Sequence, residues 1–544
     1  MTDPQASPPM PPWTPPSAAR PRSWYVKWAL LAAALLAYGV YFFAGDTWGT
    51  RAYAFDRCAD GVWEEGPDDE CVGVTDGTFS FDDSLDHITE DIREANQNVE
   101  KSGKRWVTVA YVHPLTIGSA DDKDDNAALQ ELEGAYAAQD ELNNRQGTVP
   151  RIKVAIANTG SGGKQWEAVA ERLLELKEDR EHPLVAVTGF GPSYETTKSL
   201  VDRLREAELP MVGATSTADE LADAKEPGFF RVTNPNKKQA SAIVRHLVEE
   251  QRRKGSYRVA MIKDRNTGEA YSRSLSEGFE EQARKQGLRL EPLGLSYEAG
   301  APALANAFGS IADRVCRHEP DAVYFAGRGR ELRQFIKAMS VTGRQCGVTV
   351  FTGDDAVSIY ADGMESKEKL AELTEDWRRS AVKVRFTGLA HPGMWREDAD
   401  GKGYPQGKDP FPAFAARYEK LTGRDRAKLD DGQVIAVYDA MLVAGKAIQD
   451  VWTHEPSDSS SGGKDDGKGG SGADLPWPPK EPPHLAVRQM LLQIKKGNEA
   501  AGLSGLIHFA DDGNPVQKPL PLVELLPTGE FRFTERETPP GPAG

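Results

Sequence analysis

The stretch Val107-Thr-Val-Ala-Tyr-Val112 is followed by Gly134-Ala-Tyr-Ala-Ala-Gln-Asp-Glu-Leu-Asn-Asn144 and then by Ile152-Lys-Val-Ala-Ile-Ala157. The first and third stretches are short and rich in β-branched residues, which is typical of strands buried on both faces of a sheet. The second has the length and composition of a helix. The order therefore predicts a strand–helix–strand unit, the building block of a parallel sheet.

The same alternation continues along the chain. Further strands are expected at residues 184–188, 211–212, 258–263, 322–326 and 348–352. Between them apolar residues recur at helical spacing, as they do from Trp166 to Leu174. This alternation predicts an α/β fold with helices flanking parallel sheets, and the run is too long for one sheet, so we expect two lobes.

Bulk composition narrows the function. The chain has 544 residues, enough for two to four domains with cores of their own. Its formal net charge of −17 argues against a nucleic-acid partner, because phosphates require a basic face. Hydrophobic residues make up only 39% of the chain, so part of it is expected to be solvated tail or linker.

Residues 28–45 are uncharged and apolar, and their 18 positions reach the length needed to cross a bilayer core. Basic residues precede this stretch and Asp46 follows it, so the positive-inside rule places the N-terminus in the cytoplasm. We therefore expect a single-pass cell-membrane protein with a transmembrane helix over 24–45 and an extracellular binding domain. The alternative is a cleaved signal peptide, for which Ala52-Tyr-Ala54 offers a motif unusually far from the apolar run.

Four cysteines in an exported chain suggest two disulfides. Cys58 and Cys71 stand close together ahead of the regular pattern and are expected to close a small loop. Cys316 ends an expected helix and Cys346 precedes an expected strand on the same side of the sheet, which allows a second disulfide. A pair of free buried thiols is the alternative for Cys316 and Cys346.

Composition also divides the chain into segments. Residues 1–23 hold eight prolines without periodicity, as expected of a disordered cytoplasmic tail. Residues 46–104 are expected to form a polar juxtamembrane segment. Residues 455–484 are rich in Ser, Gly, Asp and Lys, which predicts a linker or loop insertion. Helix-like and strand-like segments return after it, so we expect 105–454 and 485–534 to form one domain.

Four longer segments carry a further signal: Glu133-Gly-Ala-Tyr-Ala-Ala-Gln-Asp-Glu-Leu-Asn-Asn144, Val185-Ala-Val-Thr-Gly-Phe-Gly-Pro-Ser-Tyr-Glu-Thr-Thr197, Leu209-Pro-Met-Val-Gly-Ala-Thr-Ser-Thr217 and Gly505-Leu-Ile-His-Phe-Ala-Asp-Asp-Gly513. Their order and spacing resemble type I periplasmic solute-binding proteins, and most of all the leucine/isoleucine/valine-binding branch. The resemblance covers roughly residues 105–534 and rests on the order of many elements, not on one motif.

The resemblance implies two Rossmann-like lobes joined by three crossovers, the Venus-flytrap arrangement, with a ligand held in the cleft. Lobe 1 would comprise about 105–235 and 388–454, and lobe 2 about 236–387 and 515–534. The family implies an amino acid or a similar small polar ligand, delivered to an ABC permease without a cofactor. A receptor-like sensor read by a membrane partner is the alternative. The 27 residues before the apolar stretch are too few for an output domain, which favours delivery.

Candidate ligand contacts in lobe 1 lie in two loops that follow strands. One loop contains Ser193 and Tyr194, and the other contains Thr215, Ser216 and Thr217. Backbone N–H groups at helix N-termini, together with small hydroxyls, suit a carboxylate, and the family uses the matching loops for this purpose. Plain helix capping is the alternative for these Ser and Thr residues.

Candidate contacts in lobe 2 are acidic and aromatic. Asp355 lies where the family's amine-binding acidic residue is expected, and Asp354 could take the same role or cap the following helix. The branch tends to carry an aromatic-Gly pair in the loop after 258–263. Here that loop reads Asp264-Arg-Asn-Thr-Gly-Glu-Ala-Tyr271, so Tyr271 is shifted and Gly268 or Glu269 takes the contact position. This departure weakens the case for branched-chain specificity.

Other motifs point away from metal sites and catalysis. The acidic stretch 121–125 imitates part of a calcium loop, but Ala127 stands where that loop needs glycine. Gly160-Ser-Gly-Gly-Lys164 lacks the spacing and the closing Ser/Thr of a phosphate loop. The chain has no H-E-x-x-H, no clustered Cys/His ligands and no G-x-S-x-G elbow. We therefore expect a binding protein without metal or cofactor, and not an enzyme.

Overall fold

The computed structural model describes residues 57–116, 125–145, 150–179, 183–342, 346–360, 367–396, 403–425, 429–454 and 483–537. One compact unit runs from Cys58 to Gly544. The predicted membrane span, the acidic residues 121–124 and nearly all of the linker 455–484 lie outside the described residues. Within the described ranges, none of the helices combines the length and the apolar composition that a membrane crossing requires.

In the described part of the chain, lobe 1 is built on an eight-stranded sheet with the order β1-β2-β3-β5-β4-β6-β7-β8. Its strands are β1 (Arg57–Ala59), β2 (Val62–Glu65), β3 (Glu70–Thr75), β4 (Trp106–His113), β5 (Arg151–Asn158), β6 (Leu184–Gly189), β7 (Met211–Gly213) and β8 (Phe229–Arg231). Strands β4 to β8 pair in parallel, with Val109 opposite Val154. The predicted strands 107–112, 152–157, 184–188 and 211–212 are confirmed, since each lies inside one of these elements.

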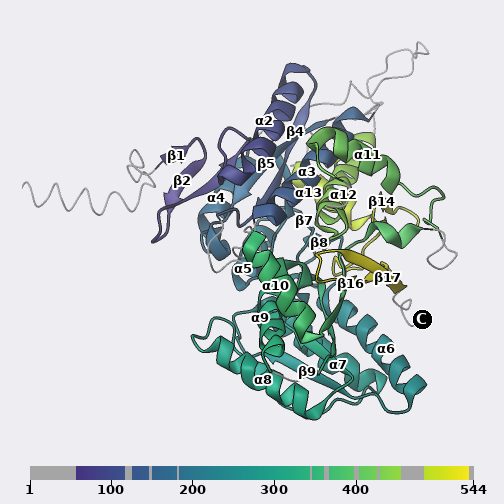
Figure 1. Ribbon diagram of the computed structural model, residues 1–544. Coiled ribbons are helices and arrows are strands. Elements are labelled where there is room, and N and C mark those ends of the chain that lie inside the picture. Colours follow the sequence, from purple (N-terminus) through teal and green to yellow (C-terminus); the bar gives the residue numbers. More distant parts are fainter. Residues whose placement is uncertain are drawn as a thin grey trace, which may run out of the picture. The chain divides into compact units, whose positions relative to one another are not determined.

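Helices cover both faces of this sheet (Figure 1). One face packs against α2 (Asp86–Lys101), α3 (Asp125–Asn144), α11 (Phe411–Thr422), α12 (Gln433–His454) and α13 (Pro483–Leu492). The other face packs against α4 (Trp166–Lys177) and α5 (Glu195–Glu206). With helices on both faces the central strands are dry, which explains their continuous apolar sequences.

Lobe 2 repeats the plan, with the order β10-β9-β11-β12-β13-β16-β17 among the described strands. These are β9 (Val259–Asp264), β10 (Leu295–Tyr297), β11 (Ala322–Ala326), β12 (Thr349–Thr352), β13 (Lys383–Thr387), β16 (Leu520–Leu525) and β17 (Phe531–Glu537). One face packs against α6 (Asn236–Lys254) and α7 (Ala270–Gln286). The other packs against α8 (Leu304–His318), α9 (Gly329–Ser340) and α10 (Lys367–Ser380).

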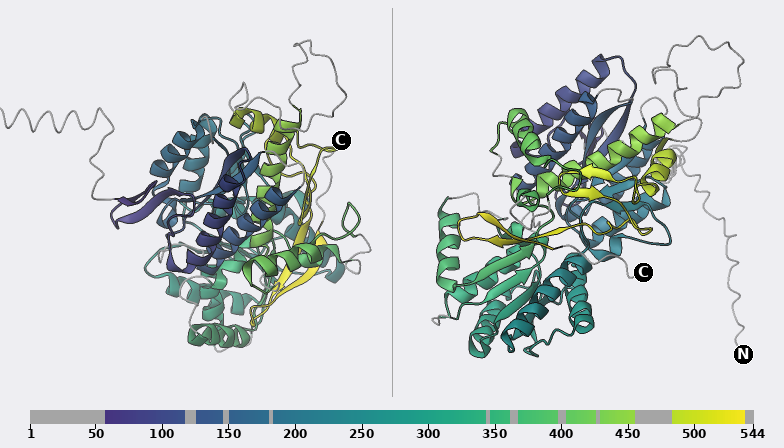
Figure 2. Two further views of the ribbon diagram at one scale, coloured as in Figure 1. Left: turned by 90° about the horizontal axis from the view of Figure 1, so that it is seen from above. Right: turned by 90° about the vertical axis from the view of Figure 1, so that its right-hand side faces the viewer.

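The chain passes between the lobes three times in the described residues. It leaves lobe 1 after β8, returns after β13, and enters lobe 2 again before β16. Ahead of this last passage, β14 (Ala500–Gly502) and β15 (Gly505–Ile507) pair as a small separate ribbon. Figure 2 shows the C-terminal strands, in yellow, beside strands of lobe 2 that come from the middle of the chain. This topology agrees with the two lobes and three crossovers that the resemblance implies.

The segment before residue 105 differs from the expected juxtamembrane stretch. Strand β3 pairs antiparallel with β5, placing Val74 opposite Ala157. The Asn96 side chain on α2 donates to the carbonyl oxygen of Val154 over 2.8 Å. Residues 57–104 are therefore part of lobe 1, and the predicted boundary at 104 falls inside this lobe. Charged residues surround the few buried valines of β2 and β3, so the sequence pattern does not indicate that these strands join the sheet.

Two disulfides connect elements of the fold. Cys58 is bonded to Cys71, joining β1 to β3. Cys316, near the end of α8, is bonded to Cys346, shortly before β12. The second bond encloses 30 residues of sequence separation and ties a helix on one face of lobe 2 to the sheet.

Candidate functional site

The loop between β6 and α5 has a left-handed backbone. Phe190 has φ of +68°, between Gly189 at +95° and Gly191 at +37°. Positive φ is costly for a bulky residue and persists only where neighbouring groups hold it. The hydroxyl of Ser216 lies 2.7 Å from the carbonyl oxygen of Phe190 and 3.0 Å from that of Gly191. Ser216 therefore holds this loop in place from the next strand-end loop.

Ser193, in the first loop, also bonds to the second loop, but as an acceptor. Its Oγ accepts hydrogen bonds from the backbone N–H groups of Thr217 and Ala218, both over 3.1 Å. Two N–H groups that converge on one oxygen atom form the geometry that binds a carboxylate oxygen. In this structure a serine hydroxyl takes that place.

Asp354 links lobe 1 to lobe 2. It opens the short 3-10 helix η4 (Asp354–Tyr360) after β12, and only 6% of the residue is exposed. Its Oδ1 accepts from the hydroxyl of Thr217 in lobe 1 over 3.2 Å and from the amide of Gln239 over 2.6 Å. The Gln239 carbonyl oxygen accepts in turn from the Asp354 N–H and from the Thr387 hydroxyl. Gln239 and Thr387 lie next to two of the crossovers, so the network spans the hinge.

Burial perturbs the acid–base chemistry of this network. It raises the pKa of Asp354 to about 7, and the nearby charge of Asp355 adds to the rise, while the hydrogen bond from Gln239 opposes it. Tyr271 is fully buried beside these carboxylates, and burial raises its pKa well above the ordinary value. Its hydroxyl accepts from the Asp355 N–H over 3.1 Å. Tyr271 is therefore a neutral phenol at the meeting of the lobes.

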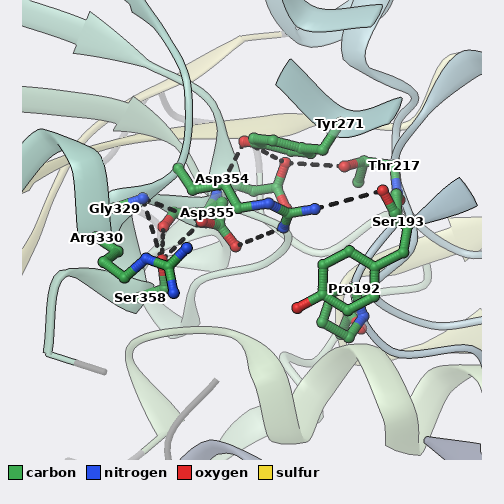
Figure 3. A network of polar contacts seen from close by, with 12 residues as sticks. Pro192, Ser193, Thr217, Tyr271, Gly329, Arg330, Asp354, Asp355 and Ser358 are labelled. Carbon is green, nitrogen blue, oxygen red and sulfur yellow. Dashed lines mark hydrogen bonds and ion pairs between the residues drawn. The ribbon is translucent and has the colours of Figure 1, made fainter. Parts of the chain in front are cut away.

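Asp355 caps the start of α9. Its Oδ2 accepts from the N–H of Gly329 over 3.0 Å and from the hydroxyl of Ser358 over 2.6 Å. Its Oδ1 lies 3.6 Å from a guanidinium nitrogen of Arg328. Figure 3 shows this group, with Ser193 and Thr217 facing Asp354, Asp355 and Tyr271.

Arg328 lies between the lobes, and only 3% of it is exposed. Its guanidinium carbon lies 4.9 Å from the ring centre of Tyr194 in lobe 1 and 5.1 Å from that of Tyr271 in lobe 2. Its Nε donates to Glu269 over 2.8 Å, and a terminal nitrogen donates to the carbonyl oxygen of Ser193 over 3.3 Å. We call the four side chains of Tyr194, Tyr271, Glu269 and Asp355 the cation cage.

The structure brings most of the predicted site residues together. Ser193, Tyr194, Thr217, Tyr271, Asp354 and Asp355 meet directly or through Arg328. Ser216 lies behind them and holds a loop. Thr215 also faces lobe 1, with its hydroxyl 3.4 Å from Glu131 and 3.5 Å from the Gly191 carbonyl oxygen. Glu269 lies in the cage; it is one of the two residues expected at the contact position in the loop 264–271, which departs from the family pattern.

Arg328, Gln239 and Thr387 were not among the predicted residues. Arg328 follows β11 closely, so the rule that ligands gather at the carboxyl ends of parallel strands could have found it. No local pattern marks Gln239 or Thr387, because their importance comes from the crossovers that bring them to Asp354.

The structure also bears on the rejected motifs. Among the described residues, no three His, Cys, Asp or Glu side chains are placed to hold a metal ion. The glycine-rich stretch 160–164 forms the short turn η2 (Ser161–Gly163) after β5. The acidic stretch 121–125 falls almost wholly outside the described residues.

The arrangement of two lobes around a shared polar site agrees with a known family. The model of the receptor family ligand binding region matches residues 130–526. The chain belongs to this family. The family is that of receptor ligand-binding regions, so the role of the chain is ligand binding and not catalysis. A comparison with curated protein sequences gives no significant match.

Several solved structures have a similar fold over most of this chain. A leucine-binding protein from Thermotoga maritima is 17% identical with a TM-score of 0.55, over 80% of this chain and 99% of that one. A branched-chain amino acid ABC transporter protein from Thermus thermophilus with bound valine is 14% identical with a TM-score of 0.54, over 80% and 97%. An ABC transporter substrate-binding protein from Desulfitobacterium hafniense in complex with Leu is 16% identical with a TM-score of 0.52, over 79% and 100%. At these identities the likeness shows the fold, which is that of type I periplasmic binding proteins.

Proposed function

We propose that the chain is a membrane-anchored solute-binding protein that traps a small polar ligand between its lobes and delivers it to an ABC transporter. The ligand would be an amino acid or an amino-acid-like compound. One observation carries the proposal: Ser193 and Thr217, from strand-end loops of lobe 1, meet Asp354 and Arg328 of lobe 2 beside the cation cage. Hydroxyls and N–H groups thus face carboxylates and aromatic rings across one interface.

The two halves of this interface suit the two charges of an amino acid. The N–H groups of Thr217 and Ala218, which converge on the Ser193 hydroxyl, suit an α-carboxylate. The cation cage suits an ammonium, since it offers carboxylates and aromatic faces. The similar proteins solved with leucine and valine support an amino acid as the ligand.

Anchoring and delivery rest on the sequence. Residues 28–45 have the length and composition of a membrane span, and the charges around them favour an extracellular binding domain. Membrane fractionation of a C-terminally tagged chain tests the anchor: the tag is expected with the membranes. A tag found only in the medium would contradict anchoring.

A thermal-shift screen of the full chain in detergent tests ligand binding. The probes are the twenty amino acids, with small acids and sugars as comparison classes. A ligand at 100-fold excess over its Kd stabilises the folded state by about 2.7 kcal/mol, which raises the melting temperature measurably. Stabilisation by one or a few amino acids is expected, and a response confined to sugars or to small acids would refute an amino-acid ligand.

A receptor-like sensor is the second candidate, because the matching family is described as a receptor ligand binding region. The same lobe closure would then be read by a membrane partner and not by a permease. Uptake of the radiolabelled ligand separates the two. Cells without this chain lose uptake if the protein delivers solute, and they keep normal uptake if it senses.

A further inference from the structure

One buried side chain that contacts both lobes is a cation of the chain itself. Arg328 contacts Ser193 and Tyr194 of lobe 1, and Glu269, Tyr271 and Asp355 of lobe 2. Arg273 also pairs across the lobes, with Glu195 and Glu220, but its side chain is 31% exposed. Solvent screens such exposed pairs, whereas the 3% exposure of Arg328 leaves its interactions largely unscreened.

The place of Arg328 in the chain is unfavourable for local structure. It is the N-cap residue of α9, and its side chain makes no capping hydrogen bond. Helix N-termini favour Ser, Thr, Asp or Asn at this position and disfavour a cation, because the helix dipole is positive there. Asp355 supplies the missing cap by accepting from Gly329. A residue that breaks a local rule at the interface between the lobes points to a functional constraint, not to helix stability.

The groups around Arg328 are those that recognise an organic cation. Two tyrosine rings lie within about 6 Å of the guanidinium, close enough for cation–π attraction. Two carboxylates and a backbone carbonyl oxygen accept from it or lie beside it. An ammonium or guanidinium group of a solute would need the same partners, and both cations cannot occupy them together.

We propose that Arg328 is an internal ligand of the site between the lobes. Its guanidinium bridges the lobes through the cation cage and competes with the cationic group of an external ligand, an ammonium or guanidinium compound. The bridging half of this inference stands on the geometry alone, and the competing half rests on the proposed function. With this competition, the apparent Kd equals the intrinsic Kd divided by the fraction of time that the cage is free. A cage free one-tenth of the time weakens binding by about ten-fold.

Arg328→Met removes the charge and keeps the apolar stem, while Arg328→Lys keeps a charge without the planar fork. Arg417→Met is the matched control, since Arg417 pairs with Asp140 and Glu141 within lobe 1. Each substitution is made in the full chain, and circular dichroism and thermal unfolding verify that each variant folds.

The first readout is the distance between the lobes without added solute. Spin labels on Lys104→Cys in lobe 1 and Arg284→Cys in lobe 2 report it by pulsed electron resonance, because both positions are exposed. Arg328→Met should broaden and shift the distance distribution, Arg328→Lys should give an intermediate result, and Arg417→Met should leave it unchanged. An unchanged distribution in Arg328→Met overturns the bridging role.

The second readout is calorimetry with L-leucine and agmatine, which carry an ammonium and a guanidinium group, and with D-glucose as a neutral probe. Arg328→Met should bind at least one of the cationic probes about ten-fold more tightly than the parent and should leave glucose unaffected. Equal or weaker binding overturns the competition. Binding of neither cation by either protein overturns the competition. The thermal-shift screen with the twenty amino acids then decides the proposed ligand separately, and the distance measurement decides the bridging role.

Discussion

Thr217 of lobe 1 donates a hydrogen bond to Oδ1 of Asp354 in lobe 2 over 3.2 Å. Both groups are buried, and Asp354 is also held by Gln239 beside the first crossover. This single bond therefore couples the position of a strand-end loop in one lobe to the hinge side of the other.

Thr217→Val removes the bond and keeps the shape of the side chain. The loss of one buried hydrogen bond should lower the free energy of unfolding by about 1 kcal/mol. It should also widen the distance distribution between the lobes. Thr352→Val is the control, because the Thr352 hydroxyl donates to the Phe325 carbonyl oxygen within lobe 2. That variant should lose stability without altering the distance between the lobes, and equal effects of the two would contradict the coupling.

Asp354→Asn tests the acid–base state of the network. Burial raises the pKa of Asp354 to about 7, so the folded protein binds this proton more tightly than the unfolded chain. Stability should therefore fall as the pH rises from about 4 to about 7 and then level off. Asparagine keeps the acceptor oxygen and carries no charge, so the variant should lose this part of the pH dependence in urea unfolding. Asp376→Asn on α10 is the control, and an identical pH profile for parent and Asp354→Asn would rule out the assignment.

Lys518→Met tests a second buried polar network, which joins α12 to the last crossover. Asp439 accepts from the N–H groups of Leu503 and Ser504, and Lys518 donates to the Ser504 hydroxyl. Burial lowers the pKa of Lys518 to about 8 and raises the pKa of Asp439. Removing the lysine deletes a buried hydrogen bond from a charged donor and a cation near Asp439, and it should cost about 1.5–3 kcal/mol of unfolding free energy. Asp439→Asn in the same chain should restore part of this loss; no recovery would mean that the charges do not interact.

Replacing Cys316 and Cys346 by serine tests the covalent tie in lobe 2. Opening a loop of this size should lower the unfolding free energy by about 3–4 kcal/mol, mainly by freeing the unfolded chain. In the double variant, reductant should change the free energy of unfolding only through the remaining Cys58–Cys71 bond. A double variant as stable as the parent would show that the bond contributes nothing to folding.

The sequence allows the central strands to be predicted because their apolar runs are continuous and β-branched. It fails for β1 to β3, β8, β10 and β13. Short or charged segments such as Lys383–Thr387 are strands only because the neighbouring strands are present. Propensity is weak there and tertiary pairing decides.

The candidate site follows the same division. Ser193, Thr217 and Asp355 could be found because each lies shortly after a strand, where parallel sheets collect ligands. The contacts among the site residues could not be predicted, because the Thr217–Asp354 bond and the cation cage form only where the two lobes meet. The role of Arg328 depends on the path of one long side chain across that interface, and no local pattern encodes it.

Calorimetry of the full chain and of Asp355→Asn, with the amino acid that gives the largest thermal shift, measures whether Asp355 holds the ammonium group of the ligand. Asparagine retains an oxygen that can accept from Gly329 and removes the negative charge that would hold an ammonium. Asp376→Asn is again the control, because Asp376 accepts from Ser340 on the far helices of lobe 2. The parent and the control should bind, and Asp355→Asn should bind at least a hundred-fold more weakly, a loss of about 2.7 kcal/mol. Equal affinity of Asp355→Asn and the parent would contradict this role of Asp355.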